Sequence, residues 1–485
     1  MPRHNQDYDL NDLTRDLPSR VQEDMALNSA IEMPSCAAER IAAMLNTSVC
    51  NFFAVAEAEE VLANHGFTEL DPAADWKLLP GGRYYMKHND TALFAFVCGT
   101  VPPPVGGFHI IASHSDSPGF KLKPNPEIYG DGGVVSLNVE KYGGPIMYTW
   151  FDRPLSIAAR LMLRGDDPLH PVTRLVDLIN AVAVIPHLAI HFNRAVNDGN
   201  SLSVQKDMKP VMGYMSVEEF NEKKARGGVV KCLLADEAGV EPEDILAYEA
   251  VLYPVDSVFP GVGYNEDYIV SPRLDDLSMA FASLCALTET CGDSVRATRL
   301  MAIFDNEETG SGTRQGAAAP TLRNLMHRIC ASYEEEQCPA EESMAQSADS
   351  SVRLYRALER TFMISADDAH AWHPNYPEKY DPTNHPVLGG GPVVKINANC
   401  KYMTDPRGDA VFRALSEEAG VKCQYFVNHA DVAGGSTLGN ILTSQLDIAG
   451  VDMGCAIWAM HSACETGSIS DLNDTVAVFS RFYRS

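Results

Sequence analysis

Two adjacent glutamates, Glu307 and Glu308, follow the apolar run at 299–304 in the stretch RLMAIFDNEETG. Carboxylates at the end of a buried strand are costly to desolvate unless a positive charge lies beside them. A divalent metal ion supplies that charge, and it lowers the pKa of a bound water toward neutrality. Because consecutive residues leaving a strand point in different directions, one glutamate can ligate a metal while the other accepts the proton of the water. The pair therefore indicates hydrolytic metal chemistry.

Four short apolar runs end at a side chain that can bind a cation. They are FHIIAS before His114, RLMAIF before Asp305, TFMISA before Asp367 and CAIWAM before His461. Each run has the length and apolar character of a buried strand, and a parallel sheet covered by helices aligns the carboxyl ends of its strands at one edge. Taken alone, a histidine is more often structural and the glutamate pair could be solvated loop charges. The fourfold repetition favours a shared metal site.

Two further aspartates extend this candidate site. Asp275 stands at the start of a segment with helical spacing, where its ordinary role is an N-cap, although a helix start can also aim a carboxylate outward. Asp116 lies two residues beyond His114, so it could accept the second N–H of the imidazole and fix the ring orientation. Two imidazoles and several carboxylates suit a borderline divalent ion, most naturally zinc, with manganese or cobalt as substitutes.

Helix and strand patterns alternate around these residues. Apolar positions recur at helical spacing in the segments 48–67, 275–291 and 405–420, and the segment 81–99 reads as a hairpin. In the third helix Asp405 can cap the first amides, Pro406 fits the first turn and Gly420 ends it. Between about 121 and 257 the sequence changes to short apolar runs with many glycines and prolines, which predicts an inserted second domain.

Composition excludes several classes of function. The formal net charge of −27 over 485 residues should repel phosphate backbones and anionic membranes, so we expect neither nucleic-acid nor membrane binding. The sequence lacks an apolar stretch of about 18 residues and begins without a signal-peptide pattern, which favours a cytoplasmic protein. The 12 cysteines are scattered, as is typical of free thiols. The acidic segment 333–351 is expected to be a surface loop.

Other catalytic motifs are missing from the sequence. It contains no G-x-S-x-G, and no serine or cysteine stands out as a nucleophile. It also contains no H-E-x-x-H, which excludes a single-zinc protease of that kind. The glycine-rich stretch at 431–441 lacks the G-K-[ST] ending of a phosphate-binding loop, and a substrate-facing backbone loop is plausible there.

Six ordered motifs carry a resemblance to a known family. They are HSDSP, SPRLDDL, FDNEETGSGTRQGA, MISADDAHAWHPNY, GPVVKIN and AMHS, spread over roughly residues 30–480. Together they resemble the M18 metallopeptidases, the aspartyl aminopeptidase family, in the branch shared by eukaryotic enzymes and many bacterial ones. The resemblance implies a three-layer α/β catalytic domain, residues 1–120 and 258–485, with a central mixed, mainly parallel sheet. A β-rich dimerisation domain, residues 121–257, would interrupt it.

The resemblance also implies roles for individual residues. His114 and Asp367 would hold one Zn²⁺, Glu308 and His461 a second, and Asp275 would bridge the two ions. Glu307 matches the general base of the family. Asp116, which supports the imidazole of His114, is the second residue that we assign to the catalytic set. The positions that match substrate contacts are His191, His370, Lys395 and Tyr402. His191 would reach into the active site of a neighbouring subunit in a tetrahedral dodecamer built from dimers.

We therefore predict an aminopeptidase that removes an N-terminal Asp or Glu from short peptides by means of a metal-bound hydroxide. Alternative hypotheses are a metal-dependent amidase or deacetylase on a similar sheet, and a catalytically idle shell that serves as a scaffold or binds cargo. Cys464 stands where the family commonly carries arginine. A lysine in the pocket, Lys395, would favour an acidic first residue.

Overall fold

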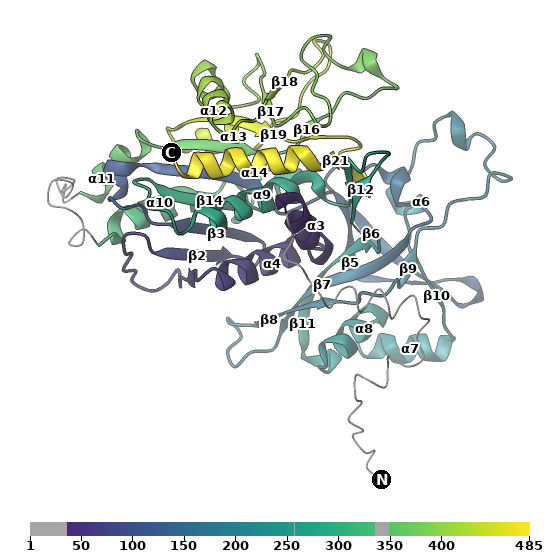
Figure 1. Ribbon diagram of the computed structural model, residues 1–485. Coiled ribbons are helices and arrows are strands. Elements are labelled where there is room, and N and C mark those ends of the chain that lie inside the picture. Colours follow the sequence, from purple (N-terminus) through teal and green to yellow (C-terminus); the bar gives the residue numbers. More distant parts are fainter. Residues whose placement is uncertain (1–35, 257, 335–348) are drawn as a thin grey trace, which may run out of the picture.

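The structure is a computed structural model that describes residues 36–256, 258–334 and 349–485 (Figure 1). Most of the acidic segment 333–351 lies outside the described residues. Among the described helices, none combines the length and the apolar character that a membrane span requires.

A nine-stranded sheet with the order β1-β2-β3-β14-β4-β15-β19-β17-β18 organises the larger domain. Its strands are β1 (Thr68–Glu69), β2 (Arg83–His88), β3 (Ala92–Val97), β4 (Phe108–His114), β14 (Thr298–Phe304), β15 (Phe362–Ala366), β17 (Val393–Lys395), β18 (Gln424–Phe426) and β19 (Ala449–Gly454). The four central strands β14, β4, β15 and β19 are parallel, whereas β3 and β17 pair antiparallel with them. The predicted mixed, mainly parallel sheet is confirmed.

Helices cover both faces of this sheet. One layer contains α3 (Ala37–Thr47), α4 (Asn51–Asn64), α9 (Leu274–Thr290), α12 (Pro406–Glu418) and α14 (Ile469–Tyr483), and the other contains α10 (Thr321–Ser332), α11 (Ser350–Leu358) and α13 (Leu438–Thr443). Side chains alternate along β3, so Leu93 and Ala95 pack on the first layer while Phe94 and Phe96 pack on the second. The short helix α5 (Pro103–Gly106) precedes β4.

Local signals place α12 as the sequence predicts. The Asp405 carboxylate accepts a hydrogen bond from the backbone N–H of Gly408 at 2.8 Å, and Pro406 occupies the first helical position. Gly420 follows the last turn with a φ of +73°, a conformation that glycine adopts without strain. The helix therefore begins and ends where its own residues dictate.

The inserted segment folds into a separate β-barrel with its own core. Its strands are β5 (Gly119–Tyr129), β6 (Val134–Tyr142), β7 (Pro154–Leu163), β8 (Val172–Asp177), β9 (Ala183–Val184), β10 (Val211–Tyr214) and β11 (Ile245–Pro254). The ring closes because β11 pairs antiparallel with both β5 and β7, and β8 adds to the edge of β7. Leu137, Ile157 and Leu161 fill the interior together with Leu234 of helix α8 (Val229–Ala238).

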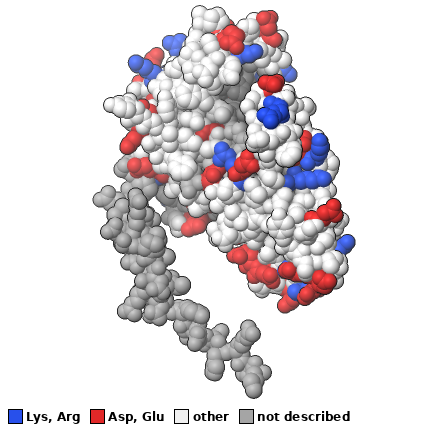
Figure 2. Space-filling view, turned by 90° about the vertical axis from the view of Figure 1, so that its right-hand side faces the viewer, with Lys and Arg blue, Asp and Glu red and all other residues white. Residues whose placement is uncertain are grey.

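The barrel also carries the helices α6 (Val204–Asp207) and α7 (Val217–Ala225). Glu218, Glu219 and Glu222 of α7 are exposed. Figure 2 shows acidic side chains gathered at the lower end of the face that it presents, where the barrel helices lie. Part of the large negative charge of the chain is therefore displayed on the barrel.

The prediction that residues 455–460 form a strand of the central sheet is wrong. The strand that pairs with β15 is β19, and the predicted run contributes only β20 (Ala456–Ile457), which pairs with β16 (Ala369–His370) in a separate small sheet. A Cβ at Gly454 would lie 1.9 Å from the backbone oxygen of Asp367, so this closely packed position admits only glycine. Such glycines interrupt the apolar pattern of β19, so the sequence pattern favours the more apolar stretch CAIWAM instead.

A third sheet contains β12 (Phe259–Val262), β13 (Tyr268–Ser271) and β21 (Glu465–Ser468).

Candidate metal centre

The five predicted metal ligands meet at the carboxyl edge of the central sheet. His114 ends β4, Asp367 follows β15, Asp275 lies in the first turn of α9, Glu308 lies in the turn after β14, and His461 lies in the loop after β20. Ligand atoms within 4.8 Å of one another form three groups: His114 with Asp275, Asp276 and Asp367; Asp275 with Glu308 and His461; and His114 with Glu307 and Glu308. The first two groups share Asp275.

Asp275 presents one carboxylate oxygen to each imidazole. Its Oδ1 lies 3.5 Å from Nε2 of His114, and its Oδ2 lies 3.4 Å from Nε2 of His461. The same Nε2 of His461 lies 3.4 Å from Oε1 of Glu308. A carboxylate between two separate donor sets is positioned to serve both of them.

Backbone carbonyls set the tautomer of both histidines. Nδ1 of His114 lies 3.0 Å from the backbone oxygen of Asp116, and Nδ1 of His461 lies 3.1 Å from the backbone oxygen of Gly144. Because a carbonyl only accepts, each Nδ1 carries the proton and each Nε2 presents a lone pair to the cluster. The Asp116 carboxylate also approaches the His114 ring, with Oδ1 at 3.3 Å from Nδ1.

Several buried carboxylate oxygens of the cluster lack a hydrogen-bond partner. They are Oδ1 of Asp275, Oδ1 of Asp276 and Oε1 of Glu308. A buried acceptor without a partner is expensive, and neighbouring carboxylates repel one another. A divalent cation would satisfy these oxygens and offset the repulsion, and imidazole nitrogens with carboxylate oxygens form a donor set that suits zinc. The residues present therefore fit a zinc site.

Burial and mutual repulsion shift the pKa values of the carboxyl groups. Burial is the largest cause that raises the pKa of Glu307 to about 7; the Asp367 and Asp275 carboxylates add to it, and His114 partly opposes it. Burial and the neighbouring Asp275 raise the pKa of Glu308 well above its ordinary value. Burial opposes ionisation of Asp275, but the two imidazoles outweigh it and lower its pKa.

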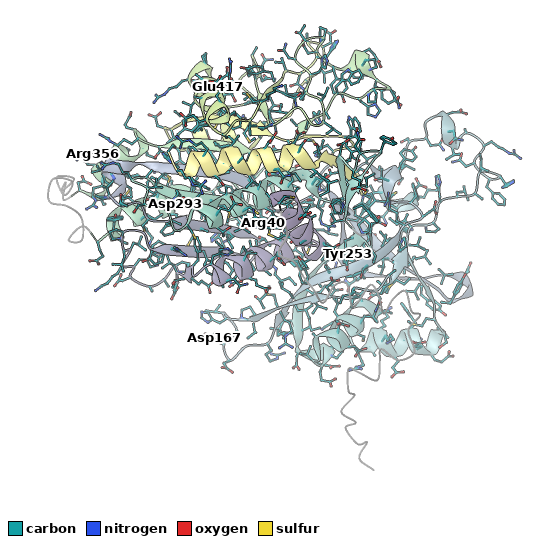
Figure 3. The ribbon with its side chains drawn as sticks, in the orientation of Figure 1. Arg40, Asp167, Tyr253, Asp293, Arg356 and Glu417 are labelled. Carbon is teal, nitrogen blue, oxygen red and sulfur yellow. The ribbon has the colours of Figure 1, made fainter. Side chains whose placement is uncertain are left out.

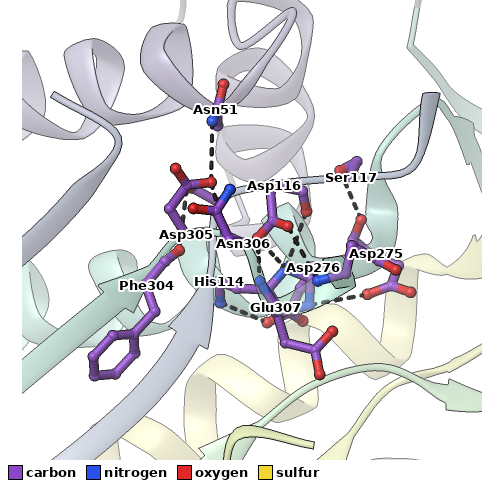
Figure 4. A network of polar contacts seen from close by, with 12 residues as sticks. Asn51, His114, Asp116, Ser117, Asp275, Asp276, Phe304, Asp305, Asn306 and Glu307 are labelled. Atoms are coloured by element: carbon purple, nitrogen blue, oxygen red, sulfur yellow. Dashed lines mark hydrogen bonds and ion pairs between the residues drawn. The ribbon is translucent and has the colours of Figure 1, made fainter. Parts of the chain in front are cut away.

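A single carboxylate positions the turn that carries both glutamates. Oδ1 of Asp116 accepts the backbone N–H of Glu307 at 3.1 Å (Figure 4), and Oδ2 accepts the backbone N–H of Glu308 at 3.1 Å. Asn306 enters this turn with a φ of +61°. In Figure 4 the Glu307 side chain extends away from the hydrogen-bonded network, so its carboxylate is left for other partners.

The predicted substrate contacts fall into two sets. Lys395 is 3% exposed, and its Nζ lies 3.6 Å from Oδ1 of Asp367 and 5.8 Å from the ring centroid of the buried Tyr402. His370 is exposed on β16 and contacts Phe426 edge to face. His191 is exposed on the barrel loop after β9 and belongs to none of the three groups. The structure thus brings Lys395 and Tyr402 to the metal centre, together with His370, whose pKa is lowered by desolvation and is also affected by the charges of Lys395, Asp275 and His461, and leaves His191 outside it.

Two carboxylates of the centre are not predicted from the sequence. Asp276 joins the first group and accepts the backbone N–H of His114 at 3.1 Å. Glu465 is buried and accepts the backbone N–H groups of Asp275 at 3.1 Å and of His461 at 2.7 Å. The only sequence signal for Asp276 is its place beside Asp275. Glu465 acts through backbone contacts, and these leave no residue pattern.

Asp305, which follows the apolar run at 299–304, lies outside the three groups. Its Oδ1 accepts hydrogen bonds from Nδ2 of Asn51 at 3.1 Å and from the backbone N–H of Asn306 at 2.8 Å. The side chain therefore points toward the start of α4, as Figure 4 shows. Successive residues leaving a strand diverge, so Asp305 fixes the turn while the glutamates that follow reach the cluster.

Comparison with known proteins identifies the family. The model of the family described as "Aminopeptidase I zinc metalloprotease (M18)" matches residues 44–483. "Probable M18 family aminopeptidase 2" of Clostridium novyi is 39% identical over 432 residues, which cover 89% of this chain and 95% of the relative.

Solved structures show the same fold. A chain in the cryo-EM structure of the Ape4 and Nbr1 complex is 32% identical, with a TM-score of 0.85, and the match covers 92% of this chain and 85% of that one. The S. cerevisiae mApe1 dodecamer is 26% identical, with a TM-score of 0.78 over 92% of this chain and 96% of that one. With its candidate metal ligands gathered at one sheet edge, the chain belongs to the M18 family of zinc metallo-aminopeptidases.

Proposed function

We propose that this aminopeptidase removes an N-terminal residue, preferably Asp or Glu, from short peptides with two zinc ions per subunit. The observation that carries the proposal is the pair of donor groups that share Asp275, with Glu307 beside them. His114 and Asp367 would hold one ion, and Glu308 and His461 the other. When bound, zinc polarises the scissile carbonyl and acidifies water.

Glu307 is the general base of this proposal. A carboxyl group with a pKa of about 7 accepts a proton from the attacking water and returns it to the leaving amine near neutral pH. Asp116 affects this proton transfer indirectly, because its two oxygens accept the backbone N–H groups of the turn that carries Glu307. The carboxylates around the site also attract the free α-amino group of the peptide.

Lys395 supports the preference for an acidic N-terminal residue. Burial opposes the charge of its ammonium group, but the Asp367 carboxylate outweighs burial, and the pKa of Lys395 rises above its ordinary value. The cation is thus retained 3.6 Å from a proposed metal ligand, within reach of the carboxylate of a bound Asp or Glu side chain.

A panel of peptides that differ only in their first residue tests this function. We expect release of Asp and Glu to exceed release of Ala and Leu by at least about tenfold in kcat/KM, since charge-assisted hydrogen bonds contribute about 1.5–3 kcal/mol. Lys395→Met should remove this preference and retain residual cleavage of neutral peptides, and a chelator should abolish all release.

Lys401→Met is the matched control, because Lys401 is exposed on the neighbouring loop. It should keep the acidic preference. Equal rates for acidic and neutral peptides with the unmodified enzyme would refute the proposed specificity, and release that persists in chelator would refute the metal mechanism.

We further propose that the subunits assemble into a tetrahedral dodecamer built from dimers. Leu188, Ile190 and Phe192 expose 56%, 48% and 82% of their surface on the loop that also carries His191, and mApe1 of S. cerevisiae is a dodecamer. Burial of this loop against a second copy would place His191 where a neighbouring site can use it. Light scattering of the purified protein should give twelve subunit masses, and the mass of one subunit would contradict the assembly.

A further inference from the structure

A segment of the barrel lies directly against the metal centre of the same chain. This barrel segment, residues 142–149, begins at the last residue of β6. The backbone oxygen of Gly144 accepts a hydrogen bond from Nδ1 of His461 at 3.1 Å, and the backbone N–H of Ile146 donates to the backbone oxygen of His461 at 2.9 Å. The barrel thus holds both the ring and the backbone of His461, whose φ is +70°.

Gly143 brings the barrel segment against Glu308. A Cβ at Gly143 would lie 3.1 Å from Cβ of Glu308 and 3.5 Å from Oε2 of its carboxylate. Gly143 also has a φ of +62°, which favours glycine. The backbone at this position therefore forms a wall that limits where the Glu308 side chain can lie.

Tyr142 connects the barrel segment to the glutamate turn. Its hydroxyl donates to Oδ2 of Asp116 at 2.6 Å and accepts from Nδ2 of Asn306 at 2.9 Å. Asp116 in turn accepts the backbone N–H groups of Glu307 and Glu308. One barrel residue thus acts on both glutamates through a carboxylate that holds their backbone N–H groups.

We propose that the barrel segment, through Tyr142, Gly143 and Gly144, positions the zinc ligands Glu308 and His461 of its own subunit. The inserted domain is then part of the metal centre within one chain, in addition to any part in assembly. This inference rests on the proposed function, which assigns Glu308 and His461 as ligands of one ion. The three residues are positioning residues, since they act through the ligands and the glutamate turn.

Gly143→Ala in the full-length protein tests the proposal, with zinc affinity measured by competition against a chromophoric chelator. We expect affinity for Zn²⁺ to fall about 10- to 100-fold, the range typical of changes to groups that orient metal ligands. Gly132→Ala is the matched control, because Gly132 has a φ of +71° in the same barrel but a Cβ there would meet nothing within 4 Å. It should bind zinc like the unmodified protein. Equal zinc affinity in the two variants overturns the proposal.

Tyr142→Phe decides the matter if Gly143→Ala fails to fold. It keeps the ring, over which Nζ of Lys121 lies 4.3 Å from the centroid, and removes only the hydroxyl. We expect kcat for peptide release to fall about tenfold with KM unchanged. Tyr129→Phe is the matched control, because it removes a hydroxyl that donates to the backbone oxygen of Met215. It should leave both constants unchanged. Unchanged kcat in Tyr142→Phe overturns the role of the hydroxyl.

The proposed function fails if the unmodified protein binds zinc but releases no N-terminal residue. In that case the comparison of zinc affinity between Gly143→Ala and Gly132→Ala still tests the barrel segment.

Discussion

Glu307→Gln should lower kcat for peptide release by about 10²- to 10⁴-fold while the zinc content and zinc affinity stay unchanged. A glutamine of the same shape cannot accept a proton, and general-base catalysis contributes a factor of this size. The backbone N–H of residue 307 still reaches Asp116, so the geometry of the turn is retained. Steady-state kinetics with an aspartyl dipeptide, together with zinc analysis of the same sample, measure both parts of this prediction.

Glu417→Gln is the control for this substitution. Glu417 is an exposed glutamate on α12, far from the glutamate turn in the chain and labelled in Figure 3. Its replacement changes the same functional group and should leave kcat unchanged. Full activity in Glu307→Gln would mean that another group takes the proton, even with zinc bound.

The pH profile gives a second view of the same residue. The base must be ionised, so kcat/KM falls as the pH drops through its pKa. That pKa is raised to about 7 in the metal-free protein, and bound cations oppose protonation, so the acid limb should lie at or below pH 7. The residual activity of Glu307→Gln should lack this limb.

Asp275→Asn should remove both zinc binding and activity. The Asp275 carboxylate faces both imidazoles, so its loss affects both donor groups at once. Metal ions stabilise a transition state by several kcal/mol, and each 1.36 kcal/mol is tenfold in rate, so kcat should fall on the order of 10³-fold or more. Calorimetric titration with Zn²⁺ and steady-state kinetics measure the two losses.

Thermal stability separates loss of the metal site from loss of structure. The unmodified protein should gain about 2.7 kcal/mol when free zinc is 100 times its Kd, and Asp275→Asn should gain nothing. The lowered pKa of Asp275 means that its carboxylate stabilises the metal-free fold above the ordinary carboxyl pKa, while its charge raises the pKa of Glu308 and Glu465, so the variant changes the stability without zinc as well. The informative quantity is therefore the difference with and without zinc.

Asp305→Asn provides the matched control, because Asp305 is also a buried aspartate beside the centre but lies outside the three donor groups. It should still gain as much stability from zinc as the unmodified protein does, because no donor group loses a member. If Asp275→Asn gained as much stability from zinc as Asp305→Asn, the proposed role of Asp275 as a ligand shared by both donor groups would be refuted.

The sequence alone determines the local elements and the chemical type of the site. Three of the four apolar runs are strands of the central sheet, and α12 begins and ends at the residues whose capping chemistry predicts it. The order of histidine, aspartate and glutamate along the chain already indicates a metal-dependent hydrolase. These features depend on contacts within a few residues, so side-chain type and spacing are enough to read them.

Only the tertiary structure decides how the segments meet. It places β19 instead of CAIWAM beside β15, turns Asp305 toward α4, and brings Asp276 and Glu465 into the centre. It also sets the glycines of the barrel segment against Glu308 and His461. Each of these results depends on close packing or on backbone hydrogen bonds between segments up to several hundred residues apart. A backbone contact makes no demand on residue type at one of its ends, and a glycine required by packing has the same letter as a glycine in any turn.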